Sequence, residues 1–174
     1  NVDNFGVSLD NIKVQTMQRV EGSGEGDFIG GANRAQFTQA GSGNDTISSG
    51  AGSDAINAGD GDDIIMAGKG ADVIDGGEGR DQVAYWDSQE GVSIDLENQR
   101  VSGGTAEGDR INSIEDAAGS NHDDTITGSR EDNRIRGGDG DDVILGGEGN
   151  DVLNGDGGRD RIDGGEGFDR VDYS

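Results

Sequence analysis

A nine-residue repeat constrains this chain more than any other feature of its sequence. From Ala40 onward, five consecutive segments read AGSGNDTIS, SGAGSDAIN, AGDGDDIIM, AGKGADVID and GGEGRDQVA. They share Gly at the second and fourth places, Asp at the sixth and Ile or Val at the eighth. The same frame extends back to Gly22, and six further units run from Gly119 to Asp172. A fixed short period of this kind predicts an architecture of stacked repeats.

The composition explains why such a chain needs help to fold. It carries 37 acidic residues against 13 Lys and Arg, a formal net charge of −24, and only 29% of its residues are hydrophobic. A chain this acidic and this poor in apolar residues stays disordered unless cations neutralise its carboxylates. An apolar residue held in one slot of every unit argues that the cation-loaded chain folds. We expect the cation-free chain to be disordered.

The charge and composition also exclude several classes of partner. The chain repels nucleic acid and anionic membrane surfaces electrostatically. It has no run of about 18 apolar residues, so we expect no membrane insertion. It has no Cys, which rules out disulfides and Cys-based metal sites.

The spacing within each unit predicts an all-β fold. The last three residues of a unit, such as Thr46 to Ser48, suit a short strand whose middle residue points inward. The six residues before them must reverse the chain, and glycines at the second and fourth places permit positive φ. Two units then make one coil of eighteen residues with two facing parallel sheets. The predicted inward stacks are Ile47, Ile65 and Val83; Ile56 and Ile74; Ile126, Ile144 and Ile162; and Ile135, Leu153 and Val171.

The same geometry stacks carboxylates along the edges of the coil. Adjacent turns lie about 4.8 Å apart, a separation at which bare carboxylates repel each other. A hard divalent cation between turns reverses this, and calcium prefers six to eight carboxylate and carbonyl oxygens. Magnesium requires a small octahedron, and zinc prefers His and Cys, so both fit poorly. The lone His122 occupies a glycine place and is interpreted as an exposed substitution.

The candidate calcium ligands are the sixth-place carboxylates and the glycine loops that expose backbone carbonyls. The carboxylates are Asp27, Asp45, Asp54, Asp63, Asp72, Asp81, Asp124, Asp142, Asp151, Asp160 and Asp169. The glycines are Gly41, Gly43, Gly50, Gly52, Gly59, Gly61, Gly68, Gly70, Gly77, Gly79, Gly138, Gly140, Gly147, Gly149, Gly158, Gly165 and Gly167.

Aspartate pairs eighteen residues apart predict the number of sites. They are Asp27/Asp45, Asp45/Asp63, Asp63/Asp81, Asp54/Asp72, Asp124/Asp142, Asp142/Asp160 and Asp151/Asp169, about seven calcium ions. Two weaker pairs, Gln36/Asp54 and Asn133/Asp151, lack one carboxylate and would bring the total to about nine. The loop GANRAQ at 31–36 has lost its glycines at the second and fourth places, and we expect it to bind no ion. The loop GSREDN at 128–133 is similarly degraded.

These residues resemble the RTX repeat, the hemolysin-type calcium-binding nonapeptide GGxGxDxUx, over about two thirds of the chain. The resemblance implies a right-handed parallel β-roll, and right-handedness agrees with the usual crossover rule. It further implies a module that folds on extracellular Ca²⁺ after type I secretion. Such modules lie within larger secreted or bacterial cell-surface adhesins, toxins or enzymes.

The repeats divide the chain into four parts. We expect residues 1–21 to be the end of a preceding β domain, with a strand in 5–14. The first roll block spans 22–84, a spacer with strands in 92–96 and 110–114 spans 85–118, and the second roll block spans 119–174. Similar sequences at 76–86 and 164–174 suggest a piece cut from a longer protein at the start of a further spacer. Tyr85 and Trp86 are expected to cap the first roll, with an aromatic sugar platform as the alternative.

Three functions remain open at this stage. The first is a structural calcium-binding module, monomeric, whose partners are calcium ions and neighbouring domains of the same polypeptide. The second is a module that binds an alginate-like polysaccharide, for which six arginines of the second block are the candidates: Arg130, Arg134, Arg136, Arg159, Arg161 and Arg170. The third, an enzyme, is the weakest, because a single His allows no nucleophile–His–acid set. We therefore expect no catalytic residues.

Overall fold

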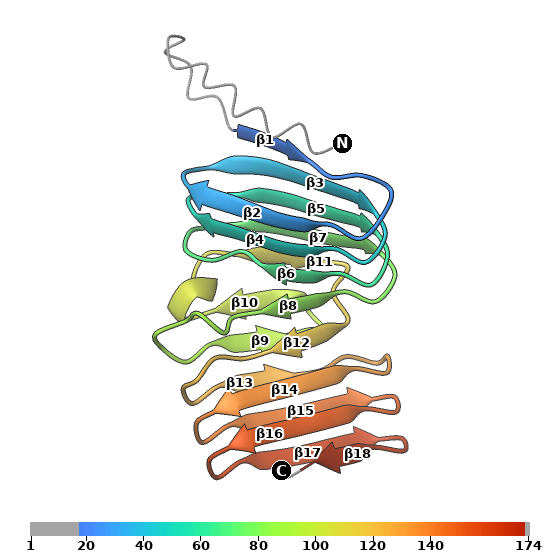
Figure 1. Ribbon diagram of the computed structural model, residues 1–174. Helices are drawn as coiled ribbons and strands as arrows, with labels where there is room; N and C mark the ends of the chain where they lie inside the picture. The colour runs from blue at the N-terminus through green and yellow to red at the C-terminus, as the bar shows by residue number, and fades with distance from the viewer. Residues whose placement is uncertain (1–17, 173–174) are drawn as a thin grey trace.

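The computed structural model describes residues 18–172 and shows two facing sheets wound from one coiled chain (Figure 1). The ten-stranded sheet contains, in spatial order, β1 (Gln18–Glu21), β3 (Gln36–Ser42), β5 (Ala55–Asp60), β7 (Val73–Glu78), β11 (Arg110–Asn112), β10 (Arg100–Ser102), β9 (Ser93–Asp95), β13 (Thr125–Thr127), β15 (Val143–Glu148) and β17 (Arg161–Glu166). The eight-stranded sheet contains β18 (Arg170–Asp172), β16 (Val152–Gly157), β14 (Arg134–Asp139), β12 (Asp116–Ala118), β8 (Gln82–Ala84), β6 (Ile64–Met66), β4 (Thr46–Ala51) and β2 (Phe28–Asn33). This is a parallel β-roll, as the repeat predicts.

The pairing register follows the eighteen-residue period of two units. In the first block Ile47 pairs with Ile65 in parallel, and Ile56 pairs with Ile74. In the second block the same offset aligns Ile126, Ile144 and Ile162 in the ten-stranded sheet and Ile135, Leu153 and Val171 in the eight-stranded sheet. The predicted inward stacks are therefore confirmed.

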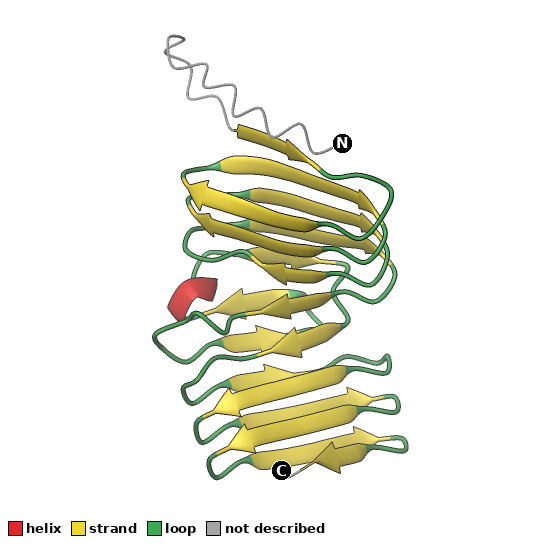
Figure 2. Ribbon diagram, in the orientation of Figure 1, coloured by secondary structure: helices red, strands yellow, loops and turns green. Residues whose placement is uncertain are grey.

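The core is a narrow double row of these eighth-place side chains. Ile47, Ile65, Ile74, Ile144 and Leu153 are fully buried, while the residues flanking them along each strand are more exposed. Burying one such side chain is worth about 1.5–3 kcal/mol. With one large apolar side chain per unit, the core is thin. Loops line both edges of the roll (Figure 2).

The spacer is woven into both sheets. Its strand β11 pairs in parallel with β7, and its strand β12 lies between β8 and β14. A hairpin of β9 and β10 occupies the ten-stranded sheet between β11 and β13, and β10 is antiparallel to both of its neighbours. Strands predicted in 92–96 and 110–114 are present as β9 and β11, whereas β10 and β12 were not predicted.

The prediction that Tyr85 and Trp86 cap an open end of the first roll is wrong. The stack continues into the spacer, because Ile74 pairs with Ile111 and Val83 with Ala117. Tyr85 is fully buried inside this continuous core, while Trp86 is 44% exposed. The strand expected in 5–14 lies outside the described residues.

Candidate metal sites along the two loop edges

The glycines at the second and fourth places of the loops are required by both conformation and space. All seventeen of the predicted loop glycines have positive φ. A Cβ on Gly59 would lie 1.9 Å from the carbonyl oxygen of Gly41, one turn earlier, and a Cβ on Gly61 would lie 2.3 Å from that of Gly43. Side chains at these places would collide with the stacked carbonyls, so the loops present bare backbone oxygens.

Sixth-place carboxylates form ladders along both edges of the roll. On the edge that precedes the eight-stranded sheet, the backbone N–H of Asp27 donates to Oδ1 of Asp45 at 2.7 Å, and the N–H of Asp45 donates to Asp63 at 2.7 Å. The same contact recurs from Asp63 to Asp81, Asp54 to Asp72, Asp124 to Asp142, Asp142 to Asp160 and Asp151 to Asp169. All seven predicted aspartate pairs are thus adjacent.

The second oxygen of most ladder carboxylates has no partner. Among the described residues, seven aspartates have an Oδ2 that is buried and accepts no hydrogen bond: Asp45, Asp54, Asp63, Asp72, Asp81, Asp142 and Asp151. A buried, unpaired carboxylate oxygen destabilises the fold, because it has lost its hydrogen bonds to water and has formed none within the protein. A cation bound at each of these oxygens would remove that cost.

Burial raises the pKa of these carboxyl groups despite the hydrogen bond that each accepts from the neighbouring turn. The pKa of Asp72 rises to about 6, and the pKa values of Asp81 and Asp142 rise to about 7. The pKa values of Asp45, Asp54, Asp63 and Asp151 are also raised, with burial as the largest cause. The roll without cations therefore holds its ladder carboxylates in an environment that penalises negative charge.

Three of the unpaired oxygens, those of Asp81, Asp142 and Asp151, face a small cradle at the first place of their own loop, where the residue is Gly. A Cβ on Gly146 would lie 2.3 Å from Oδ2 of Asp151 and 2.2 Å from the carbonyl oxygen of Gly164 in the next turn. A Cβ on Gly137 would lie 2.2 Å from Oδ2 of Asp142. Calcium–oxygen distances are about 2.3–2.6 Å, so a carboxylate and a carbonyl converge at the right spacing for this ion.

Within residues 18–172, no group of three or more acidic or His side chains is arranged to hold a metal ion. Any cation on this roll would therefore be bound by one or two carboxylates together with backbone carbonyls. That donor set is entirely oxygen, which suits a hard ion such as calcium.

In the two loops that lack the sixth-place Asp, the side-chain amide N–H donates to a backbone carbonyl. Nε2 of Gln36 donates to the carbonyl oxygen of Ser49 at 3.0 Å, and Nδ2 of Asn133 donates to that of Glu115 at 2.6 Å. The amide oxygens differ: Oδ1 of Asn133 accepts from the backbone N–H and hydroxyl of Ser129, whereas Oε1 of Gln36 is buried without a hydrogen-bond partner.

The first ladder Asp of each block is also satisfied by protein donors. Oδ2 of Asp27 accepts from the backbone N–H and hydroxyl of Ser23, and Oδ2 of Asp124 accepts from those of Ser120. His122, in the same loop as Ser120, is exposed.

Two further ladder members were missed by the sequence reasoning. The N–H of Asp72 donates to Asp109 at 2.8 Å, and the N–H of Asp81 donates to Glu115 at 2.9 Å. Asp109 had a readable signal, because residues 104–112 read GTAEGDRIN, with Asp at the sixth place and Ile at the eighth. Glu115 had none, since only three residues, 113–115, separate β11 from β12.

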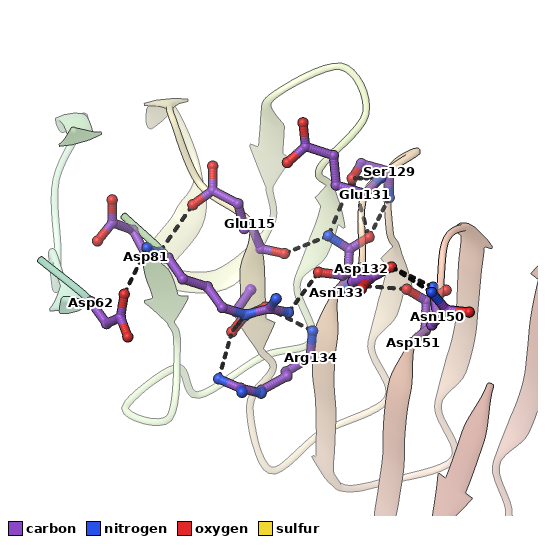
Figure 3. Close-up of polar contacts among 12 residues, drawn as sticks. Asp62, Asp81, Glu115, Ser129, Glu131, Asp132, Asn133, Arg134, Asn150 and Asp151 are labelled. Carbon is purple, nitrogen blue, oxygen red and sulfur yellow. Dashed lines mark hydrogen bonds and ion pairs between the residues drawn. The ribbon is translucent and has the colours of Figure 1, made fainter. Parts of the chain in front are cut away.

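The spacer and the degraded loop 128–133 meet in a cluster that carries its own positive charge. The guanidinium of Arg80 donates twice to Asp116, at 2.9 and 2.7 Å, and once to the carbonyl oxygen of Asp132 at 2.6 Å. On the opposite edge, the hydroxyl of Tyr85 donates to Oδ2 of Asp109 at 3.1 Å. We call Arg80, Tyr85, residues 109–118 and loop 128–133 the joint; several of its residues are labelled in Figure 3.

Comparison with known proteins agrees with this geometry. A profile of the RTX calcium-binding nonapeptide repeat matches residues 39–65, 57–85, 118–153 and 140–171, more than half of the chain. The chain therefore belongs to the RTX repeat family, whose repeats form a calcium-binding structural module and are typical of secreted proteins. A comparison with curated proteins found no match. The described part of the chain has no helix long and apolar enough to cross a membrane.

Proposed function

We propose that this chain is a calcium-triggered folding module within a larger secreted or cell-surface protein. The observation that carries the proposal is the set of seven buried aspartate oxygens without a donor, each on a ladder of glycine loops. We infer about one calcium ion for each of these oxygens. Seven ions would move the formal net charge from −24 to about −10.

The physical mechanism couples ion binding to folding. Without cations, each turn of the roll buries carboxylates that repel their neighbours, and the thin core does not offset that cost. With cations, the free energy of binding becomes free energy of folding, because the ligand set does not exist in the unfolded chain. The role is structural rather than catalytic, and the module acts as a monomer.

The working concentration range fits a role outside the cell. Extracellular calcium modules bind at roughly 10⁻⁴–10⁻³ M, far above cytosolic calcium levels. The chain would stay unfolded inside the producing cell, pass through a type I secretion channel and fold on meeting external calcium. Folded, it would support the neighbouring domains of the same polypeptide.

Far-ultraviolet circular dichroism tests this function directly. The desalted protein in chelator should give a coil spectrum, and millimolar calcium should produce a cooperative gain of strand signal. Magnesium at the same concentration, the matched control, should produce little change. Equal strand content in chelator and in calcium would overturn the proposal.

Carbohydrate binding is the second candidate, and one surface feature favours it. Trp86 lines a hollow of about 310 Å³ together with Asn121, Arg136 and Asp139. An exposed indole beside polar groups is a suitable platform for a sugar ring.

The arginines of the second block do not favour binding of an acidic polysaccharide, because most of them already form ion pairs with acidic side chains. Arg136 pairs with Asp156, Arg159 with Asp141 and Arg130 with Glu97. The chain has one Trp, so its fluorescence reports on this hollow alone. Alginate oligomers titrated into the calcium-loaded protein should change that fluorescence if the candidate holds; no change at millimolar oligomer removes it.

A further inference from the structure

The last aspartate of the first block, Asp81, differs from its counterparts because the next turn comes from the spacer. Its side chain is fully buried, and its Oδ2 accepts no hydrogen bond. Its Oδ1 accepts the N–H of Asp63, as in every regular turn. In a regular turn, a loop eighteen residues further along supplies the opposing carbonyl. Here the chain passes through the β9–β10 hairpin after β8 and returns beside the first block only at β11 and β12.

The backbone of Ser113 supplies the missing carbonyl. A Cβ on Gly76, at the first place of this loop, would lie 2.5 Å from Oδ2 of Asp81 and 2.1 Å from the carbonyl oxygen of Ser113. The corresponding distances at Gly146, in a regular turn of the second block, are 2.3 and 2.2 Å. Ser113 has φ 52, a left-handed conformation that is uncommon outside glycine. The spacer thus reproduces the cradle with a strained residue and without a glycine loop.

Glu115 brings a second carboxylate to Asp81. Its Oε2 accepts the N–H of Asp81 at 2.9 Å, the position that an aspartate holds in the regular ladder. Because the loop from 113 to 115 is three residues shorter than a repeat loop, the extra methylene of Glu bridges the remaining distance. Figure 3 shows one oxygen of Glu115 directed at Asp81 and the other directed away from it.

The cation of the joint is directed elsewhere, so it does not fill this place. Arg80, next to Asp81 in the chain, places its guanidinium against Asp116 and the carbonyl of Asp132. Asn133 contacts the backbone carbonyl of Glu115, not its carboxylate.

We propose that Asp81, Glu115 and the carbonyl of Ser113 form a divalent-cation site that joins the first repeat block to the spacer. The proposal rests on the calcium-binding function proposed above and extends it to a loop that lacks the nonapeptide sequence. A cation there would tie β8 to β12 and so make the first block and the spacer fold together.

Replacing Glu115 by Gln tests the site by counting ions. Native mass spectrometry of the calcium-loaded protein should show one ion fewer in E115Q than in the unmodified chain. E78Q, which removes an exposed carboxylate from the same loop as Asp81, is the matched control and should keep the full count. An unchanged count in E115Q overturns the site. No bound calcium in any of the proteins would instead overturn the proposed function.

A second variant, E115D, keeps the proposal testable if E115Q fails to fold. Circular dichroism in saturating calcium verifies that each variant gains the same strand signal. If E115Q does not fold, E115D decides, because it keeps the charge but cannot reach both the N–H of Asp81 and the ion. One site should then weaken at least about tenfold in a calorimetric calcium titration. Calcium affinities equal to those of the unmodified chain would overturn the proposal.

Discussion

The middle of each repeat block and the joint bury carboxylates in the same roll but satisfy them differently. In the middle of the blocks, Asp63 and Asp142 each keep one buried oxygen without any protein donor. At the joint, Asp109 accepts from Tyr85, and Asp116 accepts from Arg80. The comparison teaches that the need for cations comes from the glycine loops, because they supply oxygens and no donor to the buried carboxylates.

This difference separates buried carboxylates that need a cation from those that already have a protein donor. The joint has an internal counter-ion that is only partly exposed, with Arg80 at 28% and Asp116 at 6% side-chain exposure. Buried pairs of this kind hold one arrangement because removing either partner leaves an unpaired charge. In the folded roll, the joint therefore helps to hold the two blocks in register through an ion pair within the protein.

The largest effect should come from removing a carboxylate in the middle of a block. D142N takes away the charge of a buried ladder oxygen. Mutating a residue that only hydrogen-bonds to a metal ligand typically weakens metal affinity by about 10–100-fold. Losing the ligand itself should therefore raise the calcium concentration at the midpoint of folding at least about tenfold. A calcium titration followed by circular dichroism measures the midpoint. D139N, an exposed change in the same loop, is the control, and equal midpoints for the two variants would contradict the account.

Breaking the joint should have a smaller effect and a different signature. R80M removes both guanidinium hydrogen bonds to the buried Asp116 and leaves it only its contacts with Arg134, which should cost about 1.5–3 kcal/mol in calcium. Thermal unfolding should become less cooperative, because the two blocks lose their common contact. R159M removes an arginine from the same place in another loop, where the side chain is 90% exposed, and should change stability by about 0.5 kcal/mol or less. A loss in R159M as large as in R80M would remove the distinction.

Placing a carboxylate in a loop whose amide already donates to the neighbouring carbonyl should not create a new site. Q36D replaces the amide that donates to Ser49 with a shorter carboxylate, in a loop without glycines at its second and fourth places. We expect no additional calcium and a loss of about 1–3 kcal/mol from the unpaired buried groups. Ion counting and thermal unfolding measure both quantities. Q39E, an exposed change on β3, serves as the control, and one extra calcium in Q36D would contradict the interpretation.

The smallest effect is the pH dependence, which should have opposite signs with and without calcium. Folded-state pKa values of Asp72, Asp81 and Asp142, about 6 to 7, lie above the ordinary 3.8. In chelator, their contribution to roll stability is fully present below about pH 4 and is lost as the pH rises through 6 to 7. In calcium, protons compete with the ion, so affinity should fall as the pH drops through 7 to 6.

Circular dichroism and calcium titrations from pH 4 to 8 check both signs. A modest gain of strand signal at pH 4 in chelator supports the account. Calcium affinity that stays constant between pH 5 and 8 would contradict the assignment of these carboxylates as ligands.

Much of the fold could be predicted because a single period controls it. The nine-residue register fixes which side chains point inward, such as Ile65 and Ile144, and which carboxylates stack, such as Asp45 on Asp63. The glycines of the loops could be predicted because only glycine tolerates positive φ against a stacked carbonyl. These features are local and repeat without change.

The joint could not be predicted, because its contacts join residues far apart in the sequence. Arg80 contacts Asp116 and Asp132, which lie 36 and 52 residues further along the chain. The nine-residue period predicts neither contact. The β9–β10 hairpin inserts between strands that the period would make neighbours. Glu115 occupies a ladder place from a shortened loop, so its register could be seen only after β12 was placed beside β8.

The central claim is that calcium ions replace the missing partners of buried carboxylate oxygens. Anomalous X-ray scattering from crystals of the calcium-loaded protein tests it most directly, because it places each ion. We predict peaks beside Oδ2 of the seven aspartates Asp45, Asp54, Asp63, Asp72, Asp81, Asp142 and Asp151, and none beside the amides of Gln36 and Asn133. Peaks of equal height beside those two amides, or none beside Asp63 and Asp142, would contradict it.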